Sequence, residues 1–291
     1  MLNYSNNGLR RVENELVFGG HIVSLISPAL ILTVCILQDI SINIGTLLIA
    51  YIIPLIVYSY NYQNEPEKLS TNSEKEAFIL NRKKNFPILM GLALLVLLFL
   101  VAESFNYGFF IFSLIILTGG ILYTVILKVL TKYIFCFKNL YVAGIWAYAG
   151  TFFVLFYHSI DLTIFYYVIF VYIYVKIFIN NVFFDIKDIE SDKMKDLNTV
   201  PIKLGKDTTI YLLHILNIIS VIILIIAIYL GILPLYAIFL LITNLYVLFY
   251  LEKGKTADYD GLLKYTYLMA DAEFILWPII LIIGKIIFNY F

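Results

Sequence analysis

The chain has 291 residues, of which 62% are hydrophobic and only 14% are charged, and its mean hydropathy is +0.92. Soluble domains are about 45–50% apolar and about 25% charged. This composition therefore excludes an ordinary soluble domain and indicates a polytopic membrane protein. The 20 basic and 20 acidic residues balance, which argues against nucleic acid as a partner. The two cysteines have no paired spacing, so neither a disulfide framework nor a zinc site is expected.

Nine segments are long and apolar enough to cross a bilayer as helices. They cover residues 18–38, 41–60, 87–102, 108–127, 140–160, 163–184, 209–230, 232–251 and 262–288. Backbone groups in lipid must be hydrogen-bonded within the segment, and apolar runs of this length without strict alternation are helical. The sequence therefore predicts an all-α fold with nine transmembrane helices, in a single domain that spans residues 1–291.

The basic residues predict the orientation. Nineteen of the 20 lie before the first span or in and around the connections after spans two, four, six and eight, and only Lys285 lies elsewhere. The positive-inside bias then predicts a multi-pass protein of the cell membrane with a cytoplasmic N-terminus and an outside C-terminus. The long polar connections at 61–86, 185–208 and 252–261 fall on the cytoplasmic side, where we expect any chemistry.

An acidic run follows the sixth span. In a helix, Asn181, Asp185, Asp188 and Asp192 would lie within about 60° of one another on one face. Neighbouring carboxylates repel each other, so this arrangement favours a bound cation. Mg²⁺ prefers one or two carboxylates together with waters and phosphate oxygens, which favours a metal-bridged phosphate. The alternative is a solvated helix end whose charge is balanced by neighbouring lysines, namely Lys187, Lys193 and Lys195.

A second polar cluster lies 120 residues, and four spans, earlier in the chain. Three positions correspond at this offset: Asn61 with Asn181, Glu65 with Asp185, and Asn72 with Asp192. A shift of four spans keeps both clusters on one face of the membrane, as in two parallel repeats. Unless these matches arise by chance, the two clusters converge over one cavity.

These residues resemble motifs of the UbiA family of intramembrane prenyltransferases. The second family motif is an Asp-rich stretch followed by Thr-x-Pro-x-x-Leu-Gly, and the chain reads Asp185-Ile-Lys-Asp188-Ile-Glu-Ser-Asp192, then Thr199-Val-Pro201-Ile-Lys-Leu204-Gly205. The resemblance implies nine helices around a central cavity with cytoplasmic cap loops. It also implies Mg²⁺-dependent transfer of a prenyl chain from an isoprenyl diphosphate to an aromatic or lipid acceptor within the membrane.

The first family motif is incomplete. The family usually has Asn-x-x-x-Asp-x-x-x-Asp, whereas this chain has Asn61-x-x-x-Glu65-x-x-x-Leu69. Glu65 can ligate a metal ion and Leu69 cannot. A family Tyr-x-x-x-Lys feature is one residue longer here, from Tyr123 to Lys128. These departures leave open a second hypothesis, a non-catalytic UbiA-like protein that binds a prenyl lipid or a partner. A transporter is disfavoured, because the acidic clusters lie at the ends of spans.

The sequence and the resemblance together assign roles to nine residues. The expected catalytic and metal-binding residues are Asp185, Asp188, Asp192, Asn61 and Glu65. The expected diphosphate-binding residues are Lys138, Arg82, Lys176 and Asn181.

Each of the three basic residues has a reason and an alternative. Lys138 resembles a basic position of the family just before the fifth span. Arg82 precedes Pro87, where basic residues often only anchor a span. Lys176 lies about 13 Å into the sixth span, from which its side chain can snorkel back to the interface.

Two further acids, Asp271 and Glu273, interrupt the last apolar segment. Acids inside a membrane span are candidate functional residues. They lie about 200° apart on a helix, so both cannot face one cavity. Asp271 is the candidate for the cavity side.

Overall fold

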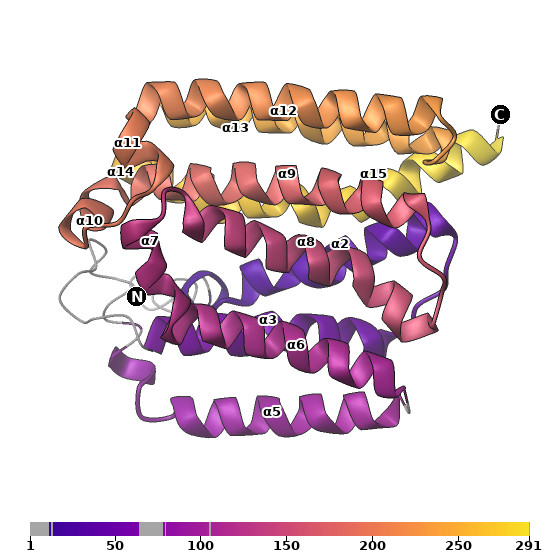
Figure 1. Ribbon diagram of the computed structural model, residues 1–291, viewed down its shortest axis with the longest axis horizontal. Helices are drawn as coiled ribbons and strands as arrows, with labels where there is room; N and C mark the ends of the chain where they lie inside the picture. Colours follow the sequence, from indigo (N-terminus) through magenta and orange to yellow (C-terminus); the bar gives the residue numbers. More distant parts are fainter. Residues whose placement is uncertain (1–11, 13, 64–77, 79, 105, 291) are drawn as a thin grey trace, which may run out of the picture.

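The computed structural model describes residues 12, 14–63, 78, 80–104 and 106–290, and this part of the chain is helical without any strand. The long helices lie roughly parallel to one another (Figure 1). They are α2 (His21–Gln38), α3 (Ile44–Gln63), α5 (Phe86–Glu103), α6 (Tyr107–Val125), α8 (Phe137–His158), α9 (Ile164–Lys187), α12 (Lys206–Tyr229), α13 (Leu241–Thr256) and α15 (Asp271–Tyr290). The predicted all-α class is confirmed.

Short helical segments connect the long helices at one end of the bundle. Four of them, α7 (Leu130–Tyr133), α10 (Ile189–Met194), α11 (Val200–Leu204) and α14 (Tyr259–Lys264), gather at the left-hand end in Figure 1. The remaining short elements are η1 (Leu127–Val129), η2 (Leu235–Leu240) and the π-helix η3 (Tyr265–Ala270). The end that carries α7, α10, α11 and α14 is called the capped end below.

Eight segments of the described chain are long and apolar enough to span a bilayer, so the predicted count of nine is not confirmed. The difference lies at the C-terminal side. The expected continuous span 262–288 is divided into α14, the π-helix η3 and α15. The start of α15 also carries two acids, Asp271 and Glu273.

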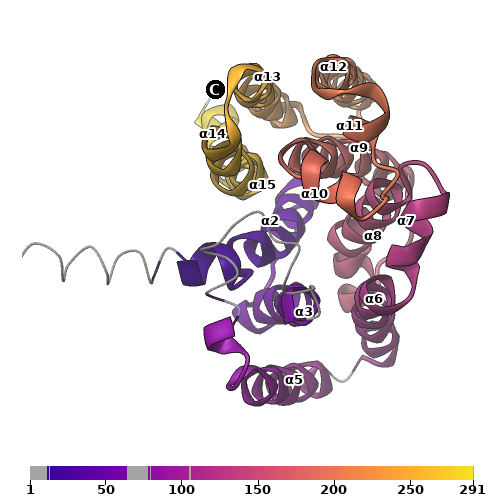
Figure 2. The same ribbon diagram turned by 90° about the vertical axis from the view of Figure 1, so that its left-hand side faces the viewer.

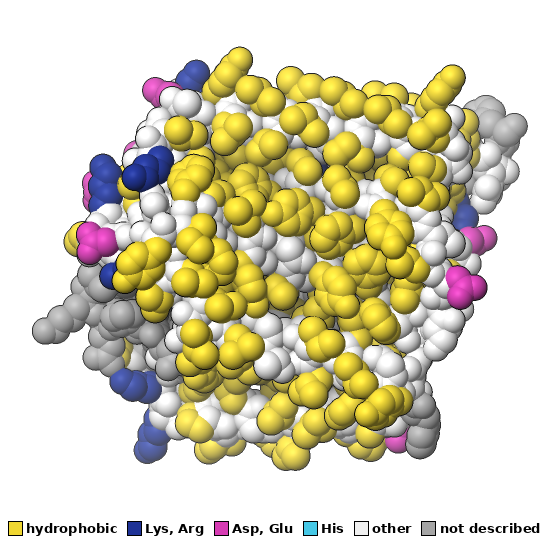
Figure 3. Space-filling view, viewed as in Figure 1, with side chains coloured by type: hydrophobic (Ala, Val, Ile, Leu, Met, Phe, Trp, Pro, Cys, Tyr) yellow, Lys and Arg dark blue, Asp and Glu magenta, His cyan; other side chains and the backbone are white. Residues whose placement is uncertain are grey.

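The sides of the bundle are covered by large apolar side chains, whereas most charged residues in Figure 3 lie at its two ends. Only 11% of the α5 segment and 33% of the α12 segment are buried inside the protein. Isoleucine, leucine and phenylalanine side chains on these helices are therefore exposed over a continuous surface. A surface of this extent is stable only in contact with lipid.

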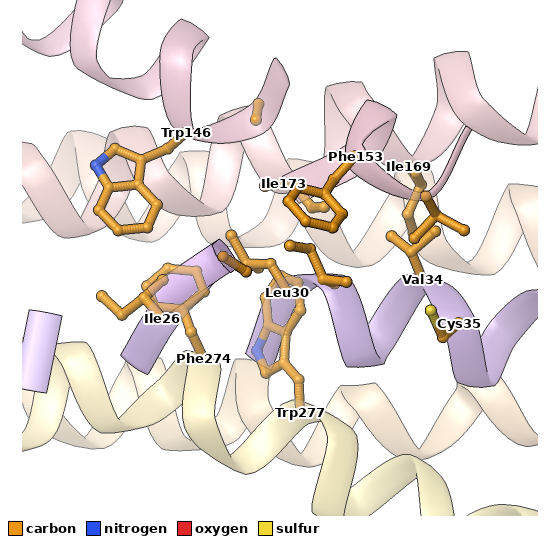
Figure 4. Packing of buried hydrophobic residues seen from close by; sticks show 14 of the residues in the cluster. Ile26, Leu30, Val34, Cys35, Trp146, Phe153, Ile169, Ile173, Phe274 and Trp277 are labelled. Atoms are coloured by element: carbon orange, nitrogen blue, oxygen red, sulfur yellow. The ribbon is translucent and has the colours of Figure 1, made fainter. Parts of the chain in front are cut away.

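Helix α2 lies at the centre of the bundle and packs against α3, α8 and α15 (Figure 2). Its completely buried Leu30 lies between aromatic side chains of α8 and α15, including Phe153 and Trp277 (Figure 4). Helix α8 approaches α2 closely at Gly150, where a Cβ would lie 3.0 Å from the Leu30 side chain and would require that side chain to shift. The contact between α2 and α15 joins the first and the last of the long helices.

Helix boundaries recur at the same 120-residue offset that relates the two polar clusters. Helices α2 and α8 end at Gln38 and His158, α3 and α9 begin at Ile44 and Ile164, and α5 and α12 begin at Phe86 and Lys206. The residues directly after α2 and α8, Asp39 and Ser159, both adopt the left-handed conformation, with φ of 56° and 53°. This conformation is uncommon outside glycine, so its recurrence at two positions 120 residues apart agrees with the repeat that the sequence suggests.

Candidate functional site

A cavity of about 240 Å³ lies among α3, α6, α8, α9 and the start of α15, towards the capped end. Its polar lining includes Asn61, Thr124, Lys138, Asn180, Asn181, Lys187, Asp188 and Asp271. Its apolar and aromatic walls include Val57, Tyr58, Tyr123, Ile145, Trp146, Phe184 and Tyr267. The cavity therefore combines charged and amide groups with an apolar wall.

A second, smaller cavity of about 60 Å³ shares part of this wall. Both are lined by Val57, Tyr58, Gly120, Ile145 and Trp146. From these shared residues the second cavity reaches Phe112, Ile116 and Phe153 and is almost entirely apolar. The two cavities are therefore adjacent.

Asp185 does not line the main cavity but is completely buried against the start of α8. One carboxylate oxygen accepts from the Lys138 ammonium at 2.5 Å, and the other accepts from the Asn139 amide at 2.8 Å. The chain before α8 is held in place by the loop after α10, because Cys136 N–H donates to the Asn198 carbonyl at 3.0 Å. Asp185 therefore positions Lys138 at the cavity wall.

Asp188 lines the cavity at the point where α9 ends. Its backbone angles, φ −98° and ψ 7°, interrupt the helix between α9 and α10. The Lys187 ammonium lies 2.6 Å from the Asp188 carboxylate, and 5.1 Å and 5.6 Å above the rings of Tyr267 and Phe184. The acidic run is therefore divided between α9, which carries Asp185, and α10, which carries Asp192, with Asp188 at the junction.

Asp192 lies in α10 and is 4% exposed. Its Oδ2 is buried and accepts no hydrogen bond from the residues that the structure describes. Burial raises the pKa of the Asp192 carboxyl to about 6; the negative charges of Asp185 and Asp188 add to the rise, and Lys138 opposes it. A cation next to Asp192 would satisfy this oxygen and favour the ionised form.

The two asparagines predicted to correspond, Asn61 and Asn181, both line the cavity. Asn61 Oδ1 and Asn181 Nδ2 are buried, and neither has a hydrogen-bond partner within the described part of the chain. Buried amides without partners are costly, so these groups are suited to binding a polar ligand. Glu65, the other predicted ligand of this cluster, lies outside the described residues, as does Leu69.

The structure does not bring Arg82 or Lys176 to the cavity. The Arg82 guanidinium pairs with Glu15 at 2.6 Å and lies 5.5 Å above the ring of Phe78. Lys176 is completely buried and pairs with Glu273 of α15 at 2.7 Å. This carboxylate fixes the ammonium inside the bundle, so Lys176 does not snorkel towards the interface.

Sequence reasoning missed three contributors to the site. The sequence suggests for Lys187 only the role of a solvated counter-charge to the acidic run, yet it lines the cavity. Asn139 binds Asp185, and Tyr267 reaches the cavity from the π-helix η3. The position of Lys187 directly before Asp188 was the available signal, whereas no sequence signal identified the π-helix.

The donor groups near the cavity fit magnesium. Among the described residues no three acidic, histidine or cysteine side chains form a closed metal cage. Magnesium does not need such a cage, because it is usually held by one or two carboxylates together with waters and phosphate oxygens. The unpaired oxygens of Asp192 and Asn61, with the carboxylate of Asp188, are hard ligands of this kind.

Comparisons with known proteins agree with this architecture. A family model described as the UbiA prenyltransferase family matches residues 84–267, which is more than half of the chain. No curated protein matches the sequence.

Several solved structures share the fold. A UbiA homologue from Aeropyrum pernix K1, in its apo form, is 12% identical with a TM-score of 0.66, over 91% of this chain and 97% of the other. A UbiA homologue from Archaeoglobus fulgidus bound to GPP and Mg²⁺ is 15% identical with a TM-score of 0.64, over 92% and 98%. A digeranylgeranylglyceryl phosphate synthase is 16% identical with a TM-score of 0.59, over 95% and 99%.

Proposed function

Because the chain belongs to the UbiA prenyltransferase family, we propose that it transfers a prenyl chain from an isoprenyl diphosphate to an acceptor within the membrane. The observation that carries this proposal is the cavity near the capped end, which has cationic and amide groups beside an aromatic and aliphatic wall. An isoprenyl diphosphate has the same division, with a highly charged head and an apolar tail. The structure of the Archaeoglobus homologue with GPP and Mg²⁺ supports this substrate class.

The diphosphate head is bound by the cavity's basic and amide groups. Lys138 and Lys187 supply positive charge, and Asn181 supplies an unpaired amide donor. Charge-assisted hydrogen bonds to phosphate are stronger than neutral ones. These groups stabilise the negative charge that develops on the diphosphate as it leaves.

Magnesium completes the charge balance at the head. The residues that would hold it are Asp188 and Asp192 from the second cluster and Asn61 and Glu65 from the first, with Asp185 orienting Lys138. When bound, the metal neutralises the diphosphate and makes it a better leaving group. The carboxylates act as ligands, so the reaction needs no histidine base.

The apolar wall accommodates the tail and protects the reacting carbon. Tyr58, Trp146, Phe184 and Tyr267 place aromatic faces around the cavity, and such faces attract a developing allylic cation. The tail continues into the second cavity past Tyr58 and Trp146. The same side chains exclude water, which would otherwise capture the cation.

The proposal also covers the domain organisation and the orientation of the protein in the membrane. We propose a single domain built from two parallel repeats offset by 120 residues, which the recurring helix boundaries support. The capped end carries the basic connections, so it faces the cytoplasm with the N-terminus, and the C-terminus lies outside.

The test uses purified protein in detergent with geranyl diphosphate as the probe. We expect binding with magnesium, no binding after chelation with EDTA, and recovery when magnesium is restored. Asp192→Ala should abolish diphosphate release while leaving the thermal stability close to that of the wild type. Asp188→Ala should also abolish release, with some loss of stability because it removes the carboxylate partner of Lys187. The matched control is Asp260→Ala, which removes an exposed carboxylate of α14 and should have no effect.

Two outcomes contradict the proposal in different ways. Unchanged turnover in both aspartate variants contradicts the metal assignment. Magnesium-dependent binding by the wild type without any release of diphosphate, with or without acceptors, instead indicates the non-catalytic lipid-binding alternative.

A further inference from the structure

Asp271 is an acid in the cavity wall to which the diphosphate site assigns no role. It is the first residue of α15, directly after the π-helix η3, and it is 3% exposed. Its Oδ1 accepts a hydrogen bond from the Asn180 amide at 3.2 Å, and both residues line the cavity. Among the described residues it forms no ion pair with a lysine, an arginine or a histidine.

The orientation of Asp271 is fixed by its neighbour Glu273. The two acids are about 200° apart around α15. Glu273 faces away from the cavity, where it pairs with Lys176 at 2.7 Å and accepts from the Tyr250 hydroxyl at 3.0 Å. With this side of the helix anchored, Asp271 is directed towards Asn180 and the cavity.

Asp271 directly follows a π-helix, a kind of segment that is frequent at functional sites. Such segments are rare and often occur where a helix must present a residue in an unusual register. The Thr266 hydroxyl of η3 donates hydrogen bonds to the carbonyls of Leu262 and Leu263 in α14, at 2.8 Å and 3.1 Å. Tyr267 of η3 reaches the cavity. The segment thus places Tyr267 and then Asp271 along one wall.

A carboxylate at this point is poorly suited to bind the donor's head. It would repel the diphosphate, whereas Lys138 and Lys187 attract it. Its partner Asn180 lies about 12 Å along the α9 axis from Asp188, as estimated from the helical rise. Asp271 is therefore available to the second substrate, whose nucleophilic group must lose a proton during transfer.

We infer that Asp271 is a catalytic residue that binds the hydroxyl group of a phenol or alcohol acceptor and takes its proton. The inference rests on the proposed function and specifies the class of acceptor. The allylic carbon–oxygen bond breaks, and its electron pair leaves with the diphosphate. The acceptor forms the new bond to the allylic carbon through an alcohol oxygen or a phenol ring carbon. Its O–H bond breaks, the proton passes to Asp271, and the electrons stay on the acceptor. Where a ring carbon has formed the new bond, that carbon then loses its C–H proton and the oxygen regains a proton, which restores the phenol.

The test separates acceptor chemistry from donor chemistry. The donor is geranyl diphosphate with magnesium, and the acceptors are 4-methylphenol and 1-O-hexadecylglycerol. Three quantities are measured: affinity for geranyl diphosphate, its hydrolysis without an acceptor, and transfer to each acceptor. Asp271→Asn keeps the size of the side chain and removes proton acceptance, Asp271→Glu restores a carboxylate, and Asp260→Asn is the matched exposed control.

We expect Asp271→Asn to bind and hydrolyse geranyl diphosphate like the wild type but to transfer it at least ~100-fold more slowly, the lower end of the usual contribution of a general base. Asp271→Glu should recover part of the transfer rate. Asp271→Ala, which opens space beside Asn180, should recover part of it with added sodium formate but not with sodium chloride.

Several results overturn the inference. One is transfer by Asp271→Asn within threefold of the wild-type rate, and another is a joint loss of donor binding and transfer in this variant. A third is a wild-type protein that binds and hydrolyses geranyl diphosphate yet uses neither hydroxyl acceptor, which leaves the donor half of the proposed function intact. A wild-type protein that does not bind geranyl diphosphate with magnesium refutes the proposed function itself.

Discussion

The buried ion pair between Lys176 and Glu273 provides a direct test of how the bundle is held together. Both side chains are completely buried, and Nζ lies 2.7 Å from Oε1. Glu273→Gln removes the negative charge but keeps an oxygen for the Tyr250 hydroxyl. It leaves the Lys176 ammonium with the amide oxygens of Asn217 and Asn244, at 3.3 Å and 3.2 Å.

Removing one partner of a buried pair costs about 3–5 kcal/mol, because the other charge remains buried without compensation. A loss of 1 kcal/mol lowers Tm by roughly 2–4 °C in a chain of about this size. We therefore expect Glu273→Gln to lower Tm by roughly 6–20 °C, and Lys176→Met to do the same. The double variant leaves no uncompensated charge and loses only hydrogen bonds worth about 0.5–1.5 kcal/mol each, so it should recover most of the loss.

The cysteines of the chain supply the assay. Cys35 and Cys136 are free and buried, so a thiol-reactive dye reports unfolding in detergent. One scan rate is used throughout, because irreversible unfolding makes Tm depend on it. A double variant that falls as far as both single variants together refutes the reasoning, as do single variants within 2 °C of the wild type.

Two further predictions concern packing and the head-group site. Gly120→Ala would place a Cβ 2.6 Å from the Val57 side chain, so it should destabilise the contact of α6 with α3 by about 1–3 kcal/mol. The control is Gly91→Ala, where the new Cβ has no neighbour within 4 Å. It should be neutral or stabilising by about 0.5–1 kcal/mol. Equal shifts in the dye assay would contradict this. Lys138→Met should weaken geranyl diphosphate binding roughly ten- to hundredfold, the value of one hydrogen bond to a charged group, and an unchanged affinity in a binding titration would exclude this lysine from the diphosphate site.

The helices could be predicted from the sequence because lipid imposes a simple rule on their composition. The sixth predicted span, 163–184, corresponds to α9 at Ile164–Lys187, and the small difference reflects polar residues that continue the helix beyond the apolar run. The last predicted span, 262–288, differs more. A π-turn changes the hydrogen-bond register without changing the composition, so hydropathy alone does not reveal η3.

Site residues could be predicted where their spacing along the sequence was sufficient. Contacts that depend on how two helices are rotated relative to each other could not. Asn61 and Asn181 were identified from their 120-residue offset, and both line the cavity. The spacing of Asp271 and Glu273 showed that they face opposite ways. It did not show that Glu273 would pair with Lys176, because that contact requires the relative rotation of two helices far apart in the sequence.

The three lysines of α8 and α9 illustrate what makes a cation available to a ligand. Lys138, Lys176 and Lys187 each pair with a carboxylate, because an ammonium in a poorly solvated environment requires a counter-charge. Lys138 and Lys187 also line the cavity, so under the proposed function a diphosphate would share their charge without separating either pair. Lys176 is completely enclosed with its partner, and reaching it would require breaking the pair that fixes α15. The location of the counter-charge, more than the lysine itself, therefore distinguishes a binding group from a structural one.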